Sequence, residues 1–169
     1  LFDFNTQGGI SLRKNIGLLI DDLNSGYTSP AVKGAELGAR AIDANMYIFP
    51  GMYLDNTQFF DSHLQYEYQY NTLFQFANDN HLDILYIMMG LIGCRINLEA
   101  RRKFLAQFLG IPVVILYTDM PGYSSIIFDN QGAFMHGIRH LIVDHGAKKI
   151  GFVSGPKTNI DAMERLSAY

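Results

Sequence analysis

The residues of this chain that are best suited to binding chemistry lie near its carboxyl end, in the segment NIDAMER. Asn159, Asp161 and Arg165 follow an apolar run and a Ser-Gly-Pro turn, at the start of an expected helix. Arginine offers a rigid fork of donors, aspartate accepts hydrogen bonds, and asparagine does both. This mixture suits a polyhydroxylated or carboxylated small ligand. The alternative is a surface ion pair, because Asp161 and Arg165 stand four residues apart and share a helix face.

A second group of polar residues follows the first apolar run, in the loop DDLNSGYTSP, where Asp22 and Tyr27 stand out. A tyrosine on such a loop can stack on a ring-bearing ligand while its hydroxyl forms a hydrogen bond, or it can pack against neighbouring loops. The loop contains one glycine and neither GxGxxG nor Gly-Lys-Ser/Thr. It therefore gives poor support for nucleotide binding.

Other residue types with chemical potential are better explained as structure. His136 and His140 have the i, i+4 spacing of metal ligands, but no HExxH glutamate and no evident third ligand accompany them, so a solvated or hydrogen-bonded helix face is expected. Cys94 is expected to be a small, partly buried residue and not a nucleophile. No GxSxG elbow is present. The sequence gives no positive case for an enzyme, and no metal or cofactor is expected.

These residues are spaced along an alternation of apolar runs and amphipathic segments. The segment 64–79 alternates like a strand but also presents a helical apolar face; its length favours a helix, with the aromatic cluster Tyr66–Phe76 in the core. Strands are expected at 15–20, 46–49, 84–89, 112–116, 125–128 and 149–154, and helices at 30–45, 64–79, 99–109, 130–144 and after 156. Such alternation predicts a doubly wound parallel α/β sheet, which binds ligands outside the carboxyl ends of its strands.

Bulk composition narrows the function classes. The chain has 169 residues, 49% of them hydrophobic, and a formal net charge of −3, which does not favour a nucleic-acid-binding surface. The basic doublets Arg101-Arg102 and Lys148-Lys149 are expected to be solvated. No apolar run reaches the roughly eighteen residues of a membrane span, and no secretory signal is recognised. With Cys94 as the single cysteine, the composition fits a reducing compartment, and we expect the cytoplasm.

The segment NIGLLIDDLNSGYTSPAVKGAELGARAIDA resembles the first βα unit of LacI-type regulators, which have the periplasmic-binding-protein-like sensor fold. The second half resembles the same family in its IPVV strand, its DN-x-x-G helix start, its HLI run, its I-x-F-x-x-GP strand and its A-x-x-R-x-x-x-Y helix. The resemblance covers nearly all of 15–169.

The resemblance implies a two-lobed clamshell that binds a sugar or a related metabolite. Residues 1–14 would be an extension or linker, 15–128 the first lobe, and 129–169 the start of an incomplete second lobe. By position, Tyr27 corresponds to an aromatic contact and Arg165 to a ligand-binding arginine, with Asn159 and Asp161 facing the ligand. Asp22 and Tyr117, on strand-end loops of the first lobe, are further candidates.

The resemblance leaves the signalling context open. The HG-x-K/R-K/R-I form is similar to sensor domains fused to GGDEF diguanylate cyclases or histidine kinases, and this context is favoured here. The alternative is the effector domain of a LacI-type transcription regulator, and a small α/β enzyme is a third, less favoured hypothesis. The expected partners are a small-molecule ligand and a second copy of the chain in a homodimer, with no nucleic acid or membrane bound by this part.

Overall fold

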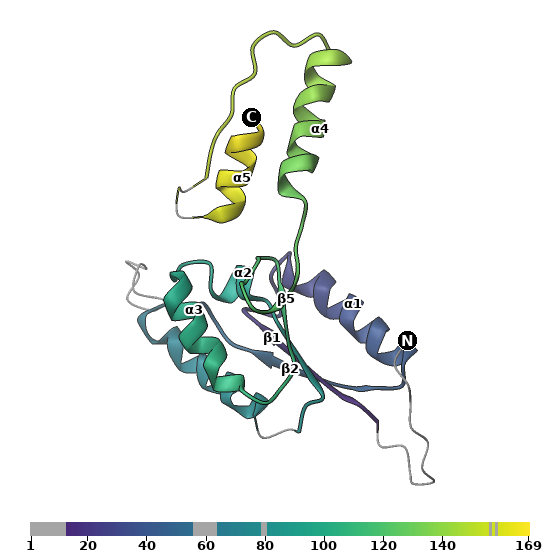
Figure 1. Ribbon diagram of the computed structural model, residues 1–169, viewed down its shortest axis with the longest axis vertical. Helices are drawn as coiled ribbons and strands as arrows, with labels where there is room; N and C mark the ends of the chain where they lie inside the picture. The colour runs from purple at the N-terminus through teal and green to yellow at the C-terminus, as the bar shows by residue number, and fades with distance from the viewer. Residues whose placement is uncertain (1–12, 56–63, 79–80, 156, 158) are drawn as a thin grey trace.

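The computed structural model describes residues 13–55, 64–78, 81–155, 157 and 159–169, and these fold around a parallel sheet (Figure 1). The sheet has five strands in the order β2-β1-β3-β4-β5, and every neighbouring pair is parallel. The strands are β1 (Asn15–Ile20), β2 (Asn45–Pro50), β3 (Ile84–Ile87), β4 (Val113–Leu116) and β5 (Ser124–Ile126). The predicted parallel α/β sheet is confirmed.

Helices cover both faces of this sheet, as the apolar strands require. In Figure 1 the helix α1 lies on the opposite side of the sheet from α3. Successive β1 residues serve the two faces: Leu18 belongs to the core under α1, and Leu19 to the core that includes Phe74 and Phe104. The helices of this part are α1 (Thr28–Ala41), η1 (Leu64–Ala77), α2 (Met89–Ile92), α3 (Leu98–Leu105) and η2 (Ala106–Phe108).

The ambiguous segment η1 is a 3₁₀ helix, not the expected α-helix. With three residues per turn, its inward positions recur every third residue, and Phe74 and Ala77 are buried. Phe74 meets Phe104 edge-on, with ring centroids 5.7 Å apart. The expectation that Tyr66 and Tyr70 pack in the core is wrong: they are 60% and 59% exposed, because a period of three turns them away from the sheet.

The helices α4 (Asn130–Val143) and α5 (Ile160–Ala168) pack against each other and project from the sheet (Figure 1). The strand expected at 149–154 is wrong, since this segment is irregular. A strand is defined by pairing with a neighbour, and no described strand lies beside it. Its aromatic residue is used in packing: Phe152 meets Phe134 edge-on at 5.0 Å and stacks on Tyr169 at 5.2 Å.

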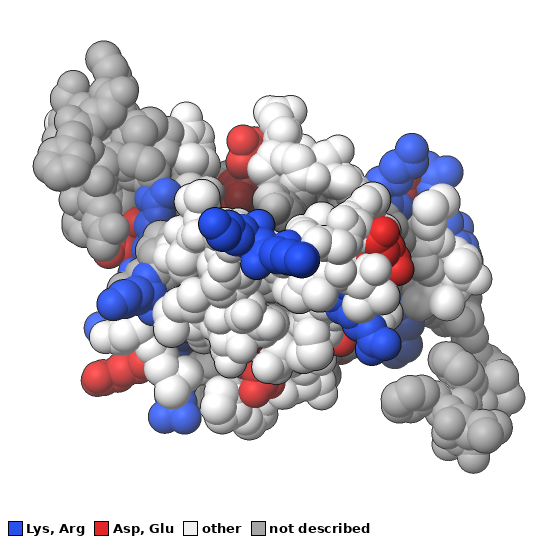
Figure 2. Space-filling view, turned by 90° about the horizontal axis from the view of Figure 1, so that it is seen from above, with Lys and Arg blue, Asp and Glu red and all other residues white. Residues whose placement is uncertain are grey.

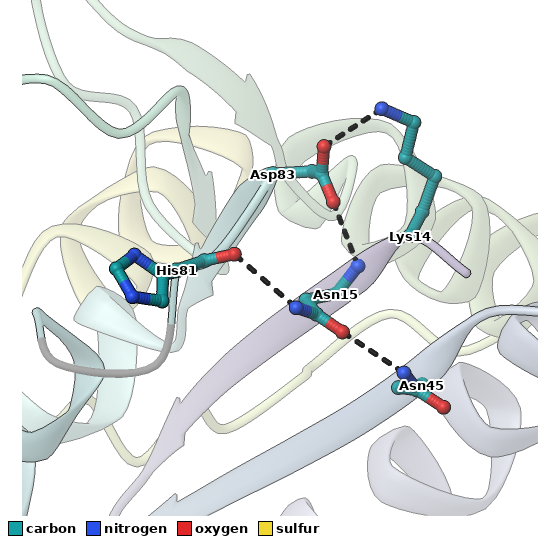
Figure 3. A network of polar contacts seen from close by, with 5 residues as sticks. All are labelled: Lys14, Asn15, Asn45, His81 and Asp83. Carbon is teal, nitrogen blue, oxygen red and sulfur yellow. Dashed lines mark hydrogen bonds and ion pairs between the residues drawn. The ribbon is translucent and has the colours of Figure 1, made fainter. Parts of the chain in front are cut away.

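A polar network joins the starts of three strands at the amino edge of the sheet (Figure 3). The Asp83 carboxylate accepts hydrogen bonds from Lys14 Nζ and from the Asn15 backbone N–H, both at 2.8 Å. The Asn15 side chain donates to the His81 carbonyl and accepts from Asn45 Nδ2. The hydrogen bond from Lys14, followed by that from Asn15, lowers the pKa of Asp83.

None of the helices in the described ranges is long and apolar enough to cross a membrane.

Candidate functional site

A pocket of about 240 Å³ lies at the carboxyl edge of the sheet, on the side opposite the amino-edge network. One wall comes from the segments that follow the five strands β1 to β5, and the other from α5 and the residue before it. Its lining consists of Tyr27, Tyr53, Gly90, Leu91, Cys94, Tyr117, Phe128, Asn159, Asp161 and Arg165. The pocket therefore combines aromatic side chains from the sheet with polar side chains from α5.

Five of the six ligand-binding residues proposed from the sequence line this one pocket; their role in binding stays a prediction. They are Tyr27, Tyr117, Asn159, Asp161 and Arg165. The sixth, Asp22, is not among the lining residues. Its exposed carboxylate accepts a hydrogen bond from the Asn24 backbone N–H at 2.9 Å, which shapes the turn before Tyr27.

Tyr117 has a strained backbone, with a φ of +69° that bulky residues rarely adopt. Its carbonyl group is packed closely over Gly90, where an added Cβ would lie 2.7 Å from the Tyr117 carbonyl carbon. The Tyr117 ring stacks on Phe128, with centroids 4.9 Å apart and an interplanar angle of 16°. Partial burial raises the pKa of its hydroxyl. This conformation holds the side chain at the pocket wall.

Tyr53 and Arg95 form a neighbouring part of the site that the sequence analysis did not single out. The Arg95 guanidinium lies 4.1 Å from the centroid of the Tyr53 ring, which is a cation–π arrangement. Burial, followed by the nearby Asp21 carboxylate, raises the pKa of Tyr53. The signal that could have found Tyr53 is its position directly after a predicted strand, in the loop Pro50–Asp55.

The loop that carries Tyr27 is fixed by a buried carboxylate. Asp21 is 5% exposed and accepts a hydrogen bond from the Thr28 hydroxyl. The Ser25 hydroxyl donates to Thr28 Oγ1 at 2.7 Å and accepts from the Thr28 backbone N–H at 3.0 Å. Tyr27 itself is 69% exposed. The loop thus holds a mostly exposed aromatic ring at the pocket mouth.

Arg101 was expected to be solvated, and this is wrong: only 9% of the residue is exposed, whereas its neighbour Arg102 is exposed. On α3, position 101 faces the sheet and position 102 faces outward. Arg101 Nε donates to the Gly93 carbonyl at 3.0 Å, and Nη1 lies 3.5 Å from Thr118 Oγ1. Desolvation by burial lowers the pKa of this guanidinium.

Arg101 lies beside a second, much smaller pocket, of about 20 Å³, which adjoins the main one. The residues of its lining come from both sides of the site: Gly90, Cys94, Arg101, Tyr117, Thr118, Asn159, Ile160 and Asp161. Five of these also line the larger pocket, and we call the small pocket its floor. The floor thus contains one guanidinium and one carboxylate.

The polar residues of α5 are arranged differently from the ion pair considered above. Arg165 donates through Nε and Nη2 to Asn130 Oδ1, at 3.2 and 2.8 Å, and does not pair with Asp161. Asn159 is the N-cap of α5, and its Oδ1 accepts from the Ala162 backbone N–H at 3.0 Å. Asn130, the first residue of α4, was not identified from the sequence.

The other chemical candidates do not form a reactive centre. Burial is the largest effect on the partly buried Cys94 thiol and raises its pKa. His140 is hydrogen-bonded to Asp144 at 2.6 Å and to His145 at 3.0 Å. These contacts are exposed, and neither histidine lines the pocket. No group of three or more metal-ligating side chains that could hold a metal ion occurs in the part of the chain that the structure describes.

The face of the molecule seen from above carries charged side chains of both signs. Figure 2 views the molecule from above and shows Lys and Arg side chains at separate places with Asp and Glu among them.

Comparison with known proteins shows the fold. No family model and no curated protein matches the chain, but solved structures do. A LacI family transcriptional regulator from Mycobacterium smegmatis has a TM-score of 0.66 and 18% identity over 91% of this chain and 49% of its own. The lac repressor dimer bound to operator and the anti-inducer ONPF has a TM-score of 0.68 and 18% identity, covering 94% of this chain and 43% of its own.

A third structure, a periplasmic binding protein/LacI transcriptional regulator from Alkaliphilus metalliredigens QYMF complexed with D-xylulofuranose, has a TM-score of 0.58 and 17% identity over 92% of this chain and 50% of its own. The chain thus spans about half the length of these proteins. The likeness confirms the fold expected from the sequence motifs, that of the periplasmic-binding-protein-like domain of LacI-type regulators.

Proposed function

We propose that this chain belongs to the effector-binding domain of a LacI-type transcription regulator and binds a sugar or a related metabolite in the pocket between the sheet and α5. The proposal assigns residues 15–128 to a first lobe and 129–169 to part of a second. Ligand would draw the lobes together and bias the protein between two states, by binding the closed state more tightly.

The main support is the composition of the pocket. Tyr27 and Tyr117 offer aromatic faces for the apolar side of a sugar ring, while Asp161 and Arg165 offer an acceptor and a donor for its hydroxyl groups. Tyr27 and Tyr117 are ninety positions apart, and Asp161 follows Tyr117 by a further forty-four, so only the folded chain brings these residues to one pocket. Strand-end pockets are also where parallel α/β sheets bind ligands.

The hypothesis of a transcription regulator is better supported than the hypothesis of a sensor domain fused to a GGDEF or histidine-kinase output. The three solved structures described above are LacI-type regulators, one of them a repressor dimer on its operator and one a complex with D-xylulofuranose. By the same analogy we propose a cytoplasmic homodimer.

Catalysis by this chain is not part of the proposal. The one thiol in the pocket, Cys94, has a raised pKa and is therefore protonated at neutral pH, which makes it a poor nucleophile. No described residue of the pocket is paired with it as a base.

A thermal-shift screen of the intact protein tests this function. The panel contains neutral sugars, sugar acids, nucleobases and organic acids, measured for the wild type, for Arg165→Ala and for Arg139→Ala as a control on the exposed face of α4. A ligand bound in the pocket raises the melting temperature by mass action. We expect a shift that Arg165→Ala removes and Arg139→Ala preserves. A well-folded protein that responds to nothing in the panel would contradict metabolite binding.

A further inference from the structure

Arg101 is the buried charge of this site without a carboxylate partner. It is 9% exposed, and no described carboxylate forms an ion pair with it. Nε is used by the Gly93 carbonyl and Nη1 is within 3.5 Å of Thr118 Oγ1, but no further hydrogen bond from the guanidinium to a described residue is formed. Burying a guanidinium in this way is costly unless something else hydrogen-bonds to it.

The small pocket at the floor of the site, which Arg101 lines, is a place where the remaining N–H groups of Arg101 can meet a partner. Its volume of about 20 Å³ holds a group the size of one oxygen atom. It opens to the larger pocket through residues that the two share, among them Gly90 and Tyr117. A ligand in the larger pocket can therefore extend one substituent to Arg101.

Asp161 faces the same small pocket from the opposite wall. A group bound there is thus met by a guanidinium, which only donates hydrogen bonds, and by a carboxylate, which only accepts them. A hydroxyl satisfies both, because its oxygen accepts from Arg101 while its proton goes to Asp161. A carboxylate or phosphate oxygen would accept from Arg101 but would bring a second negative charge against Asp161.

We propose that Arg101 is a specificity-determining residue of this site, and that with Asp161 it selects a neutral ligand through one hydroxyl group over sugar acids and sugar phosphates. This inference rests on the proposed function, whose ligand class it narrows to neutral polyhydroxy compounds. The other charged groups nearby do not reverse it. Arg95, Asp21 and Arg165 do not line the small pocket, so the charged side chains that face a group bound there are Arg101 and Asp161.

The test uses matched pairs of probes that differ in one charged group: D-glucose with D-glucuronate, D-galactose with D-galacturonate, and D-ribose with ribose 5-phosphate. Affinities are measured by isothermal titration calorimetry on the intact protein. We expect the neutral member of any binding pair to bind about tenfold or more tightly than its charged member, since a hydrogen bond to a charged group is lost and a like charge is added.

Substitutions of Arg101 and Asp161 test whether the floor of the pocket causes this preference, with Arg102 as the control position. Arg101→Gln is expected to weaken binding of the neutral sugar by about 10- to 100-fold. Arg102→Gln, the same change at the exposed neighbouring position, should leave the affinity within about twofold. Asp161→Asn removes the repulsion and should shrink the preference for the neutral over the charged probe. Circular dichroism and melting temperature check the fold of each variant.

The outcomes separate the two proposals. If neither these probes nor any compound of the thermal-shift panel binds, the proposed function is wrong and this inference falls with it. If a sugar binds but a folded Arg101→Gln protein binds it as well as the wild type does, only the assignment of Arg101 is wrong. Tighter binding of the charged members also overturns the inference alone. Should Arg101→Gln fail to fold, Asp161→Asn decides: an unchanged preference contradicts the proposal, and a reduced one supports it.

Discussion

The guanidinium of Arg165 and the side-chain oxygen of Asn130 are joined by two hydrogen bonds, of 2.8 and 3.2 Å, that connect α5 to the first residue of α4. Asn130 Nδ2 also approaches Glu164 Oε2, at 3.3 Å. The arginine at the pocket wall is thus oriented by a residue at the point where the chain leaves the sheet.

Replacing this asparagine by a carboxylate should hold the arginine too strongly. In Asn130→Asp the new charge pairs with Arg165, which then has less to offer a ligand, so we expect a ligand found in the screen to bind a few-fold more weakly. Gln131→Glu adds a similar charge at the next, exposed position and should not have this effect. Calorimetric titration compares the two. Equal affinities in both variants would show that Arg165 is not held in this way.

Gly90 allows the close approach of the Tyr117 carbonyl, so Gly90→Ala should disturb that contact. We expect a loss of about 1–3 kcal/mol in the free energy of unfolding and weaker ligand binding, because the chain at Tyr117 must shift. Gly38→Ala makes the same change in α1, where an added Cβ meets nothing within 4 Å. It should stabilise the protein by about 0.5–1 kcal/mol. Urea unfolding measures both, and a neutral Gly90→Ala would refute the contact.

The period of η1 predicts which of its aromatic residues stabilise the fold. Phe74→Ala removes a fully buried ring and should cost about 3–5 kcal/mol. Tyr70→Ala, four residues earlier on the exposed side, should change the free energy of unfolding by no more than about 0.5 kcal/mol. An α-helical segment would instead place the two residues on one face, and the two losses would then be comparable.

The amino-edge network predicts that the free energy of unfolding decreases at acid pH. Because the pKa of Asp83 is lower in the folded chain than its ordinary value of 3.8, its ionised form stabilises the fold above that pH. This contribution is lost as the pH falls from about 3.8 through the lower folded pKa. In Asp83→Asn, the free energy of unfolding should decrease less over this pH range than it does in the wild type. Carbon-13 NMR titration should show the pKa of Asp83 rising in Lys14→Met, and no rise would exclude the lysine as the main cause.

The single cysteine offers a probe of the pocket. With its pKa raised by burial, Cys94 should react with iodoacetamide at neutral pH more slowly than free cysteine, and faster as the pH is raised. A ligand in the pocket should slow the reaction further, since Cys94 belongs to the lining. Mass spectrometry follows the alkylation. A rate equal to that of free cysteine would contradict the burial of the thiol.

The sequence predicted the sheet well because apolar strands and amphipathic helices have distinct periods. The five strands that pair with one another were all expected to within a few residues. The run at 149–154 has the same composition but no described neighbour, and pairing is a property of the whole fold that local composition does not contain.

The site was predictable to a smaller extent. Residues at strand ends and helix starts, such as Tyr117 and Asn159, are found by counting along the chain. Arg101 was missed because burial of one member of an Arg-Arg pair depends on which side of α3 meets the sheet. Asn130 was missed because it acts through Arg165, thirty-five positions away.

Asn159 has a double position, as the first cap of α5 and as part of the pocket wall. Its side-chain oxygen accepts a hydrogen bond from the Ala162 N–H, which uses one of the two lone pairs of that oxygen, while both N–H groups of the amide remain for a ligand. The helix cap therefore fixes the orientation of this amide, and most of its remaining hydrogen-bonding capacity is that of a donor. A ligand with a lone pair directed at Asn159 fits this end of the pocket best.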